Sequence, residues 1–213
     1  MEDLTRPTLW GPSERPDLDA GRLHLWLCQS GNGPLREVAR ELLRDILAAY
    51  LEMRPSHVPL HLEPGQAPTV AARWQGLSLS ISMSYAGDVA LIGLCPGAKI
   101  GIDLVEIGPM PDWAPVARLY LGPDVALRLA KMNRADSEKN FLLAWAEMEA
   151  RSKCLGQGLQ EWSPTRQQRL YSPLIQAVTS ELPITQTGCT LALAVARLRP
   201  SANAIRATYA PLD

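Results

Sequence analysis

The chain has 213 residues, 46% of them hydrophobic and 20% charged, with a formal net charge of −1. This is the composition of a globular protein with one sizeable core or two small halves packed together, and the charge balance argues against a broadly basic nucleic-acid-binding domain. The four cysteines lie far apart without a Cys-x-x-Cys pair, no signal-peptide order opens the chain, and no apolar run approaches a membrane span of about 18 residues. We therefore expect a cytoplasmic protein in a reducing environment, without zinc, disulfides, nucleic acid or membrane as partners.

The first half of the chain has the pattern of one helix and a small sheet. Residues 1–20 are rich in proline and acids and are predicted to form an irregular arm, so that order begins near Arg22. Apolar residues at helical spacing predict a helix over 35–50. Apolar residues alternate with serines over 77–85, which predicts a half-buried strand with its serines on the polar face. Strands are predicted over 23–28, 77–85, 89–94 and 99–105.

The second half repeats this mixture of helix and strand. The main helix is expected over 136–155, with Asp136 as its N-cap and glycines 156 and 158 ending it. Both halves thus predict an α+β fold built from residues 21–106 and 107–213, although no residue-level repeat joins them. Shorter helices are expected over 112–120 and 124–132, and strands over 169–171, 174–179, 190–198 and 205–209.

The main helix carries an acid and one of the four lysines of the chain on one stripe. Trp145, Glu149 and Lys153 fall at i, i+4 and i+8. The carboxylate could hold Mg2+, and the lysine could neutralise charge on a phosphate. Spacing alone favours a surface Glu–Lys ion pair worth about 0.3–0.5 kcal/mol, with Trp145 on a core stripe.

A second candidate acid lies at the end of an apolar strand. Asp103 follows Ile100-Gly-Ile directly, where a buried strand emerges. Burial of a carboxylate is unfavourable unless a partner or a cation binds it. A role in a turn or as a helix N-cap is the alternative.

These two segments together resemble a known signature. Ile100-Gly-Ile-Asp103, followed by Trp145-Ala-x-x-Glu149-Ala-x-x-Lys153-x-x-Gly156-x-Gly158-Leu159, is similar to the paired motif of the 4'-phosphopantetheinyl transferases, in particular the Sfp-type branch and the holo-acyl-carrier-protein synthases. The likeness extends to the segments 82–87 and 119–123, and covers residues from about 23 to 195.

The resemblance implies a pseudo-twofold monomer with a ligand cleft between its two α+β halves, which binds coenzyme A. It implies Mg2+-dependent transfer of the phosphopantetheine arm to a serine of an apo acyl or peptidyl carrier protein in fatty-acid or secondary-metabolite biosynthesis, with release of adenosine 3',5'-bisphosphate. By matching position, Asp103 and Glu149 would bind the metal, with Glu106 as a third candidate acid. Glu149 would also help to deprotonate the attacking serine, and Lys153 would contact the phosphates.

The candidate coenzyme A contacts beyond Lys153 are Ser84 and Tyr85, by matching position, and Arg40 and Arg44 on the first-half helix. Three departures remove positive or chargeable groups: Met148 replaces a lysine, Tyr85 replaces a histidine, and Gln66 replaces the lysine of a Gly-Lys-Pro segment. Uncompensated, these losses would reduce activity. The candidates for compensation are Arg40, Arg44, Arg73 and Arg151. The alternative is a non-catalytic relative that binds carrier protein or coenzyme A without transfer.

Overall fold

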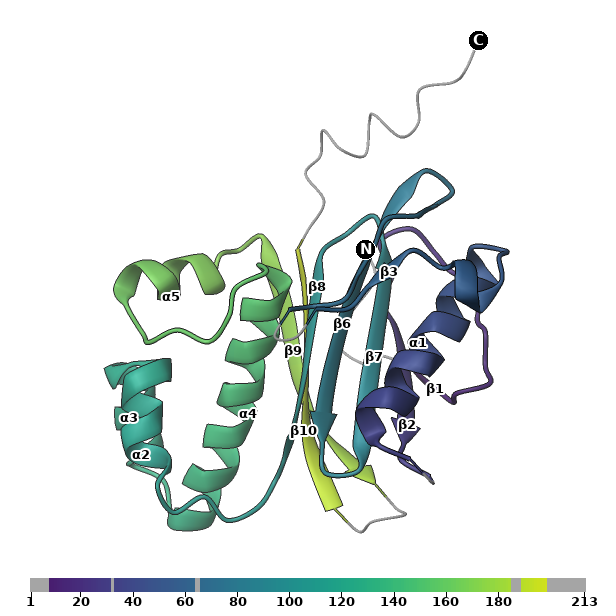
Figure 1. The fold of residues 1–213 in the computed structure, drawn as a ribbon. Helices are drawn as coiled ribbons and strands as arrows, with labels where there is room; N and C mark the ends of the chain where they lie inside the picture. The colour runs from purple at the N-terminus through teal and green to yellow at the C-terminus, as the bar shows by residue number, and fades with distance from the viewer. Residues whose placement is uncertain (1–7, 32, 64–65, 185–188, 199–213) are drawn as a thin grey trace.

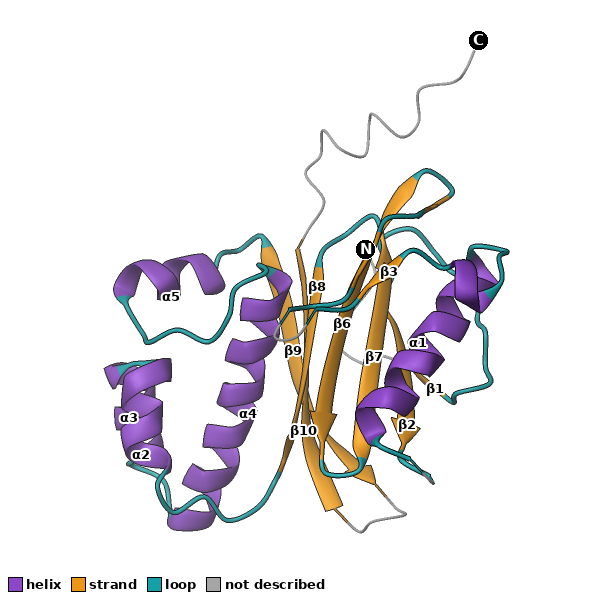
Figure 2. Cartoon of the chain, in the orientation of Figure 1, coloured by secondary structure: helices purple, strands orange, loops and turns teal. Residues whose placement is uncertain are grey.

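The computed structural model describes residues 8–31, 33–63, 66–184 and 189–198 and has the α+β class that the sequence predicts. Its layers run from helix α1 through two sheets to helix α4 (Figure 1). The larger sheet has the strand order β1-β2-β7-β6-β5 and the smaller one β8-β10-β9, while β3 and β4 form a separate pair. Strands thus lie between the helices (Figure 2).

The bounds of the elements in the first half are β1 Leu9–Trp10, β2 His24–Gln29, α1 Leu35–Tyr50, η1 Pro55–His57, β3 Leu60–His61, β4 Thr69–Val70, β5 Arg73–Trp74, β6 Leu77–Ala86, β7 Val89–Pro96 and β8 Ile100–Glu106. Those in the second half are α2 Trp113–Val116, η2 Ala117–Leu121, α3 Pro123–Leu129, α4 Arg134–Cys154, α5 Pro164–Leu170, β9 Ile175–Ile184 and β10 Cys189–Leu198.

Helix α1 packs on the outer face of the larger sheet, over the range that its apolar spacing predicts. Leu43, Ile46 and Leu47 are fully buried against Ile92 and Leu94 of β7. Burial of each such side chain contributes about 1.5–3 kcal/mol. The opposite face of this sheet packs on the smaller sheet, so that β7 is buried along its whole length.

The two sheets meet where β6 of the larger sheet contacts β8 of the smaller one. Three serines of β6 form this contact, Ser80, Ser82 and Ser84, and we call them the serine seam. Because β8 is an edge strand, its outward N–H groups need acceptors, and serine hydroxyls supply them. The serine face of β6 is therefore not a solvent-facing one. The hydroxyls of Ser80, Ser82 and Ser84 accept hydrogen bonds from the backbone N–H groups of Ile100, Ile102 and Leu104, at 3.1, 3.0 and 3.0 Å.

Helix α4 packs on the outer face of the smaller sheet at close range. A Cβ atom on Gly101 of β8 would collide with the backbone of α4 at Ala150 and Cys154, so only glycine permits this approach. The helix begins earlier than predicted, because Asn133 and not Asp136 is its N-cap: the Asn133 side chain accepts from the Asp136 N–H.

Two other predictions differ from the structure, and a third is not tested by it. The described part of the N-terminal arm is anchored: Leu9 and Trp10 pair in parallel with β2, and the Tyr50 hydroxyl donates to the Pro16 carbonyl at 2.6 Å. The segment 169–171, predicted as a strand, ends helix α5, which a proline starts and Ser163 caps. The predicted strand 205–209 lies outside the described residues. No helix in the described ranges is long and apolar enough to cross a membrane.

Candidate active site

Asp103 lies where β8 faces helix α4, and it is tied to both the serine seam and Lys153. Its side chain is 8% exposed, and the Lys153 ammonium donates to its Oδ1 at 2.6 Å. The Ser84 hydroxyl donates to the same oxygen at 2.8 Å. Lys153 also donates to the Ile102 carbonyl at 3.1 Å and to Ser84 at 3.3 Å. These three acceptors match the three N–H donors of an ammonium group.

Glu149 lies one turn before Lys153 in α4 and is held differently. Its Oε1 is buried and has no hydrogen-bond partner. Burial first, and then the Asp103 charge, raise the pKa of the Glu149 carboxyl above its ordinary value, while Lys153 and Arg166 oppose the shift. Among the described residues Lys153 pairs with Asp103 and not with Glu149, so the alternative of a surface Glu149–Lys153 pair is wrong.

The chemistry of these two acids suits a hard cation. A buried carboxylate oxygen without a donor, facing the field of a second carboxylate, is the electrostatic environment that a cation relieves. The described residues hold no group of three or more acids, histidines or cysteines placed to bind a metal. Two protein carboxylates suit Mg2+, which commonly takes one or two and completes its shell with phosphate oxygens and water.

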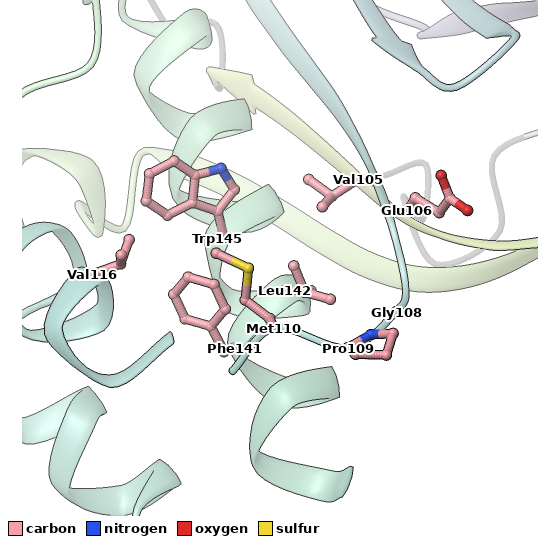
Figure 3. Close-up of a pocket in the computed structure, with 9 residues that line it drawn as sticks. All are labelled: Val105, Glu106, Gly108, Pro109, Met110, Val116, Phe141, Leu142 and Trp145. Carbon is pink, nitrogen blue, oxygen red and sulfur yellow. The ribbon is translucent and has the colours of Figure 1, made fainter. Parts of the chain in front are cut away.

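Glu106 is not brought to these acids. Side chains alternate along β8, so Gly101, Asp103 and Val105 face α4 while Glu106 faces the other way. Its carboxylate is exposed and accepts from the Cys189 thiol at 3.3 Å. In Figure 3 it points away from Trp145. The structure therefore does not support Glu106 as a third metal ligand, and the register of the strand is the reason.

A group of basic side chains surrounds Tyr85, next to Ser84 in β6. The Arg36 guanidinium lies 4.6 Å from the centre of the Tyr85 ring. Burial raises the pKa of the Tyr85 hydroxyl, and the charges of Arg36 and Arg40 act against this shift. The charges of Arg36 and Arg40 thus both act on Tyr85, whereas Arg44 makes no contact with this group among the described residues. Arg36 could have been found from its spacing, one helical turn before Arg40.

The other compensating candidates lie elsewhere. Arg151 is buried and bonds to the Glu147 carboxylate at 2.8 Å and to the Leu170 and Ile175 carbonyls, so it is a structural arginine. Arg73 is exposed and donates to the Gly76 carbonyl, two residues beyond strand β5. Gln66 is exposed and bonds to the side chain of Glu63.

Arg166 is the residue at the site that the sequence did not indicate. It comes from α5, is 6% exposed, and donates to the Ser152 hydroxyl at 3.0 Å and to the Met148 sulfur at 3.2 Å. Both acceptors flank Glu149 in α4. A single arginine in a short helix far along the chain has no spacing relative to the motif that could mark it.

A mostly apolar cavity of about 470 Å³ is lined by residues that are close to the two acids in the sequence, and Glu106 is also part of its lining. Val105, two residues beyond Asp103, and Trp145, one turn before Glu149, line it together with Met110 and Phe141 (Figure 3). Trp145 packs against Phe141 with ring centres 6.0 Å apart, as the core-stripe interpretation expects. Such a lining suits an uncharged organic segment and not a phosphate.

Comparison with known proteins finds similarity to two curated proteins that carry the same enzyme name. No family model matches the chain. It is 28% identical over 120 residues to the 4'-phosphopantetheinyl transferase HetI of Nostoc sp. (strain PCC 7120), which is 56% of this chain and 51% of that protein. It is 28% identical, again over 120 residues, to slr0495 of Synechocystis sp. (strain PCC 6803), to which the same enzyme name is provisionally given; the match covers 48% of that protein. The chain thus spans about half the length of the curated relatives it matches.

Proposed function

We propose, from the premise that the chain is a divergent relative of the 4'-phosphopantetheinyl transferases, that it transfers the phosphopantetheine arm of coenzyme A to a serine of an apo carrier protein. The observation that carries the proposal is the meeting of Asp103, Glu149 and Lys153 from two distant segments of the chain. A buried carboxylate, a second carboxylate with one buried oxygen and an ammonium group suit a metal-assisted reaction at a diphosphate.

The proposed roles follow from how each side chain is held. Asp103 and Glu149 would bind Mg2+, which when present neutralises charge on the diphosphate. The unpartnered Oε1 of Glu149, with its raised pKa, would accept the proton of the carrier serine as the serine oxygen forms a bond to phosphorus. The bond from that phosphorus to the leaving phosphate then breaks, and adenosine 3',5'-bisphosphate departs.

Lys153 and the group around Tyr85 would bind the anionic part of coenzyme A. All three donors of Lys153 have protein acceptors, the longest of these bonds being the 3.3 Å contact to Ser84. Exchange of that contact for a phosphate oxygen would keep Asp103 neutralised. Arg36 and Arg40 offer further donors beside Tyr85, which follows Ser84 in β6 and faces α1. The apolar cavity at Trp145 would receive an uncharged segment of the substrates.

The test is an intact-mass measurement of an apo carrier protein after incubation with the chain, coenzyme A and Mg2+. We expect the carrier to gain one phosphopantetheine group, the gain to vanish with a chelator, and Mg2+ to restore it. Asp103→Ala and Glu149→Ala should each reduce the rate by about 10²–10⁴-fold, because each removes a carboxylate that metal binding or proton transfer needs.

Glu106→Gln distinguishes between two possible sets of metal ligands, one with Glu106 and one without it. It should retain transfer if the metal uses only Asp103 and Glu149. No gain of mass with any of several carriers would disprove transfer, and calorimetry would then identify the alternative: carrier binding without Mg2+-dependent coenzyme A binding is the behaviour of a non-catalytic relative.

A further inference from the structure

Two arginines are buried in the part of the chain that the structure describes, and their donors are satisfied very differently. Arg151 bonds through its Nε to the Glu147 carboxylate and through Nη1 to two carbonyls, and its guanidinium lies 4.5 Å from the centre of the Tyr171 ring. Arg166 is at least as buried, but its Nε has no acceptor and no carboxylate pairs with it among the described residues. Buried charges are ordinarily paired, so Arg166 requires an explanation that Arg151 does not.

The contacts of Arg166 place its charge on one turn of α4. Its Nη2 donates to the Ser152 hydroxyl at 3.0 Å and to the Met148 sulfur, a weak acceptor, at 3.2 Å. Its Nη1 reaches the Tyr120 carbonyl only at 3.5 Å. Glu149 lies between Met148 and Ser152 in this turn, and its own Oε1 is likewise buried without a donor. The Arg166 charge acts to lower the pKa of the Glu149 carboxyl, and the Glu149 charge acts to raise the pKa of the Arg166 guanidinium.

We propose that Arg166 is a positioning residue, whose buried guanidinium supplies beside Glu149 the positive charge that Met148 does not, and so favours binding of the anionic diphosphate of coenzyme A. This rests on the proposed function. Position 148 is the one at which the resemblance implies a lysine, and the Met148 sulfur touches the Arg166 guanidinium. The positive charge thus comes from α5 and lies beside the same turn of α4.

Opposite effects on two ligands distinguish this role from a structural one. Removal of a positive charge beside Glu149 weakens the binding of an anion, but leaves the binding of a cation unchanged or makes it tighter. Collapse of the packing around α5 would weaken the binding of both. The measurement is therefore calorimetric titration of Mg2+ alone and of coenzyme A in the presence of Mg2+.

Arg166→Met should raise the Kd for coenzyme A by about tenfold or more, the effect of losing one interaction with a charged group. The Kd for Mg2+ alone should stay the same or fall. The matched control is Arg169→Gln, which removes a charge from an exposed position of the same helix and should change neither Kd.

The exchange variant Arg166→Met with Met148→Lys provides the rescue. A lysine at 148 returns the charge to the space that the guanidinium leaves, and we expect most of the coenzyme A affinity and of the transfer rate to return. If Arg166→Met leaves the Kd for coenzyme A unchanged, weakens both ligands together, or is not rescued by the exchange, the inference is overturned while the proposed function stands. A wild-type chain that neither binds coenzyme A nor transfers its arm overturns both.

Discussion

Glu149 and Asp103 carry the same functional group, yet their surroundings give them different properties. Asp103 accepts from Lys153 and Ser84, so its charge is compensated within the protein. Glu149 has a buried oxygen without a donor and a carboxyl pKa raised mainly by burial. An acid with an unsatisfied buried oxygen destabilises the fold. Such acids are common in active sites, where function requires their altered pKa.

Glu149→Gln should therefore stabilise the chain while strongly reducing the rate of transfer. The folded-state pKa of this carboxyl is raised, so the carboxylate destabilises the fold above that pKa and the penalty disappears as the pH falls below the unfolded value. Thermal melts should show a higher Tm than wild type at pH 7.5 and a smaller difference at pH 4. Glu147→Gln, which breaks the pair with Arg151, should instead lower the Tm; a decrease for Glu149→Gln as well would contradict the assignment.

At the scale of elements, the serine seam sets the position of β8 relative to β6. Because the three hydroxyls cap an edge strand, they fix the register at which Asp103 faces Ser84 and α4. Gly101 then allows α4 to approach closely enough for Lys153 to reach the Ile102 carbonyl. Two local features thus bring the halves of the motif together.

Ser82→Ala tests the seam. It leaves the buried Ile102 N–H without its acceptor, which costs about 1–3 kcal/mol, and a chain of this size loses about 2–4 °C of Tm per kcal/mol. Chemical denaturation should show the loss, and transfer should decline less than stability does. Ser78→Ala, at an exposed position of the same strand, is the control and should change neither. Equal stability of the two variants would refute a supporting role for the seam.

Across the whole molecule, buried weak acids occur on both outer layers. Burial raises the pKa of the Tyr50 hydroxyl in α1 to about 12 and that of the Cys154 thiol in α4 to about 11. Both groups bond to backbone carbonyls as neutral donors, Tyr50 to Pro16 and Cys154 to Lys99. The native state therefore favours the protonated forms more than the unfolded chain does.

The fold should consequently weaken at alkaline pH. Stability from these groups is complete below their unfolded pKa values, 9.0 for the thiol and 10.0 for the phenol, and is lost as the pH rises through about 11 and 12. Urea unfolding at pH 8 and at pH 10.5 should show the decline. Tyr50→Phe and Cys154→Ala should each be less stable than wild type at pH 8 and decline less steeply, whereas the partly exposed Cys189→Ala should follow wild type; parallel curves for all four would contradict the prediction.

The sequence by itself determined the α+β class, helix α1 to the residue, the strands β6, β7 and β8, and the acids and the lysine of the two motifs. These follow from periodicity and spacing, which act over a few residues of the chain. It could not tell whether Lys153 pairs with Glu149 or with Asp103, that Glu106 faces away, that the serines of β6 are buried in a seam, or that Arg166 lies beside Met148. Those outcomes depend on which elements pack together, and only the tertiary structure decides that, because contacts between residues of different elements, 18 to 69 positions apart here, leave no local pattern in the chain.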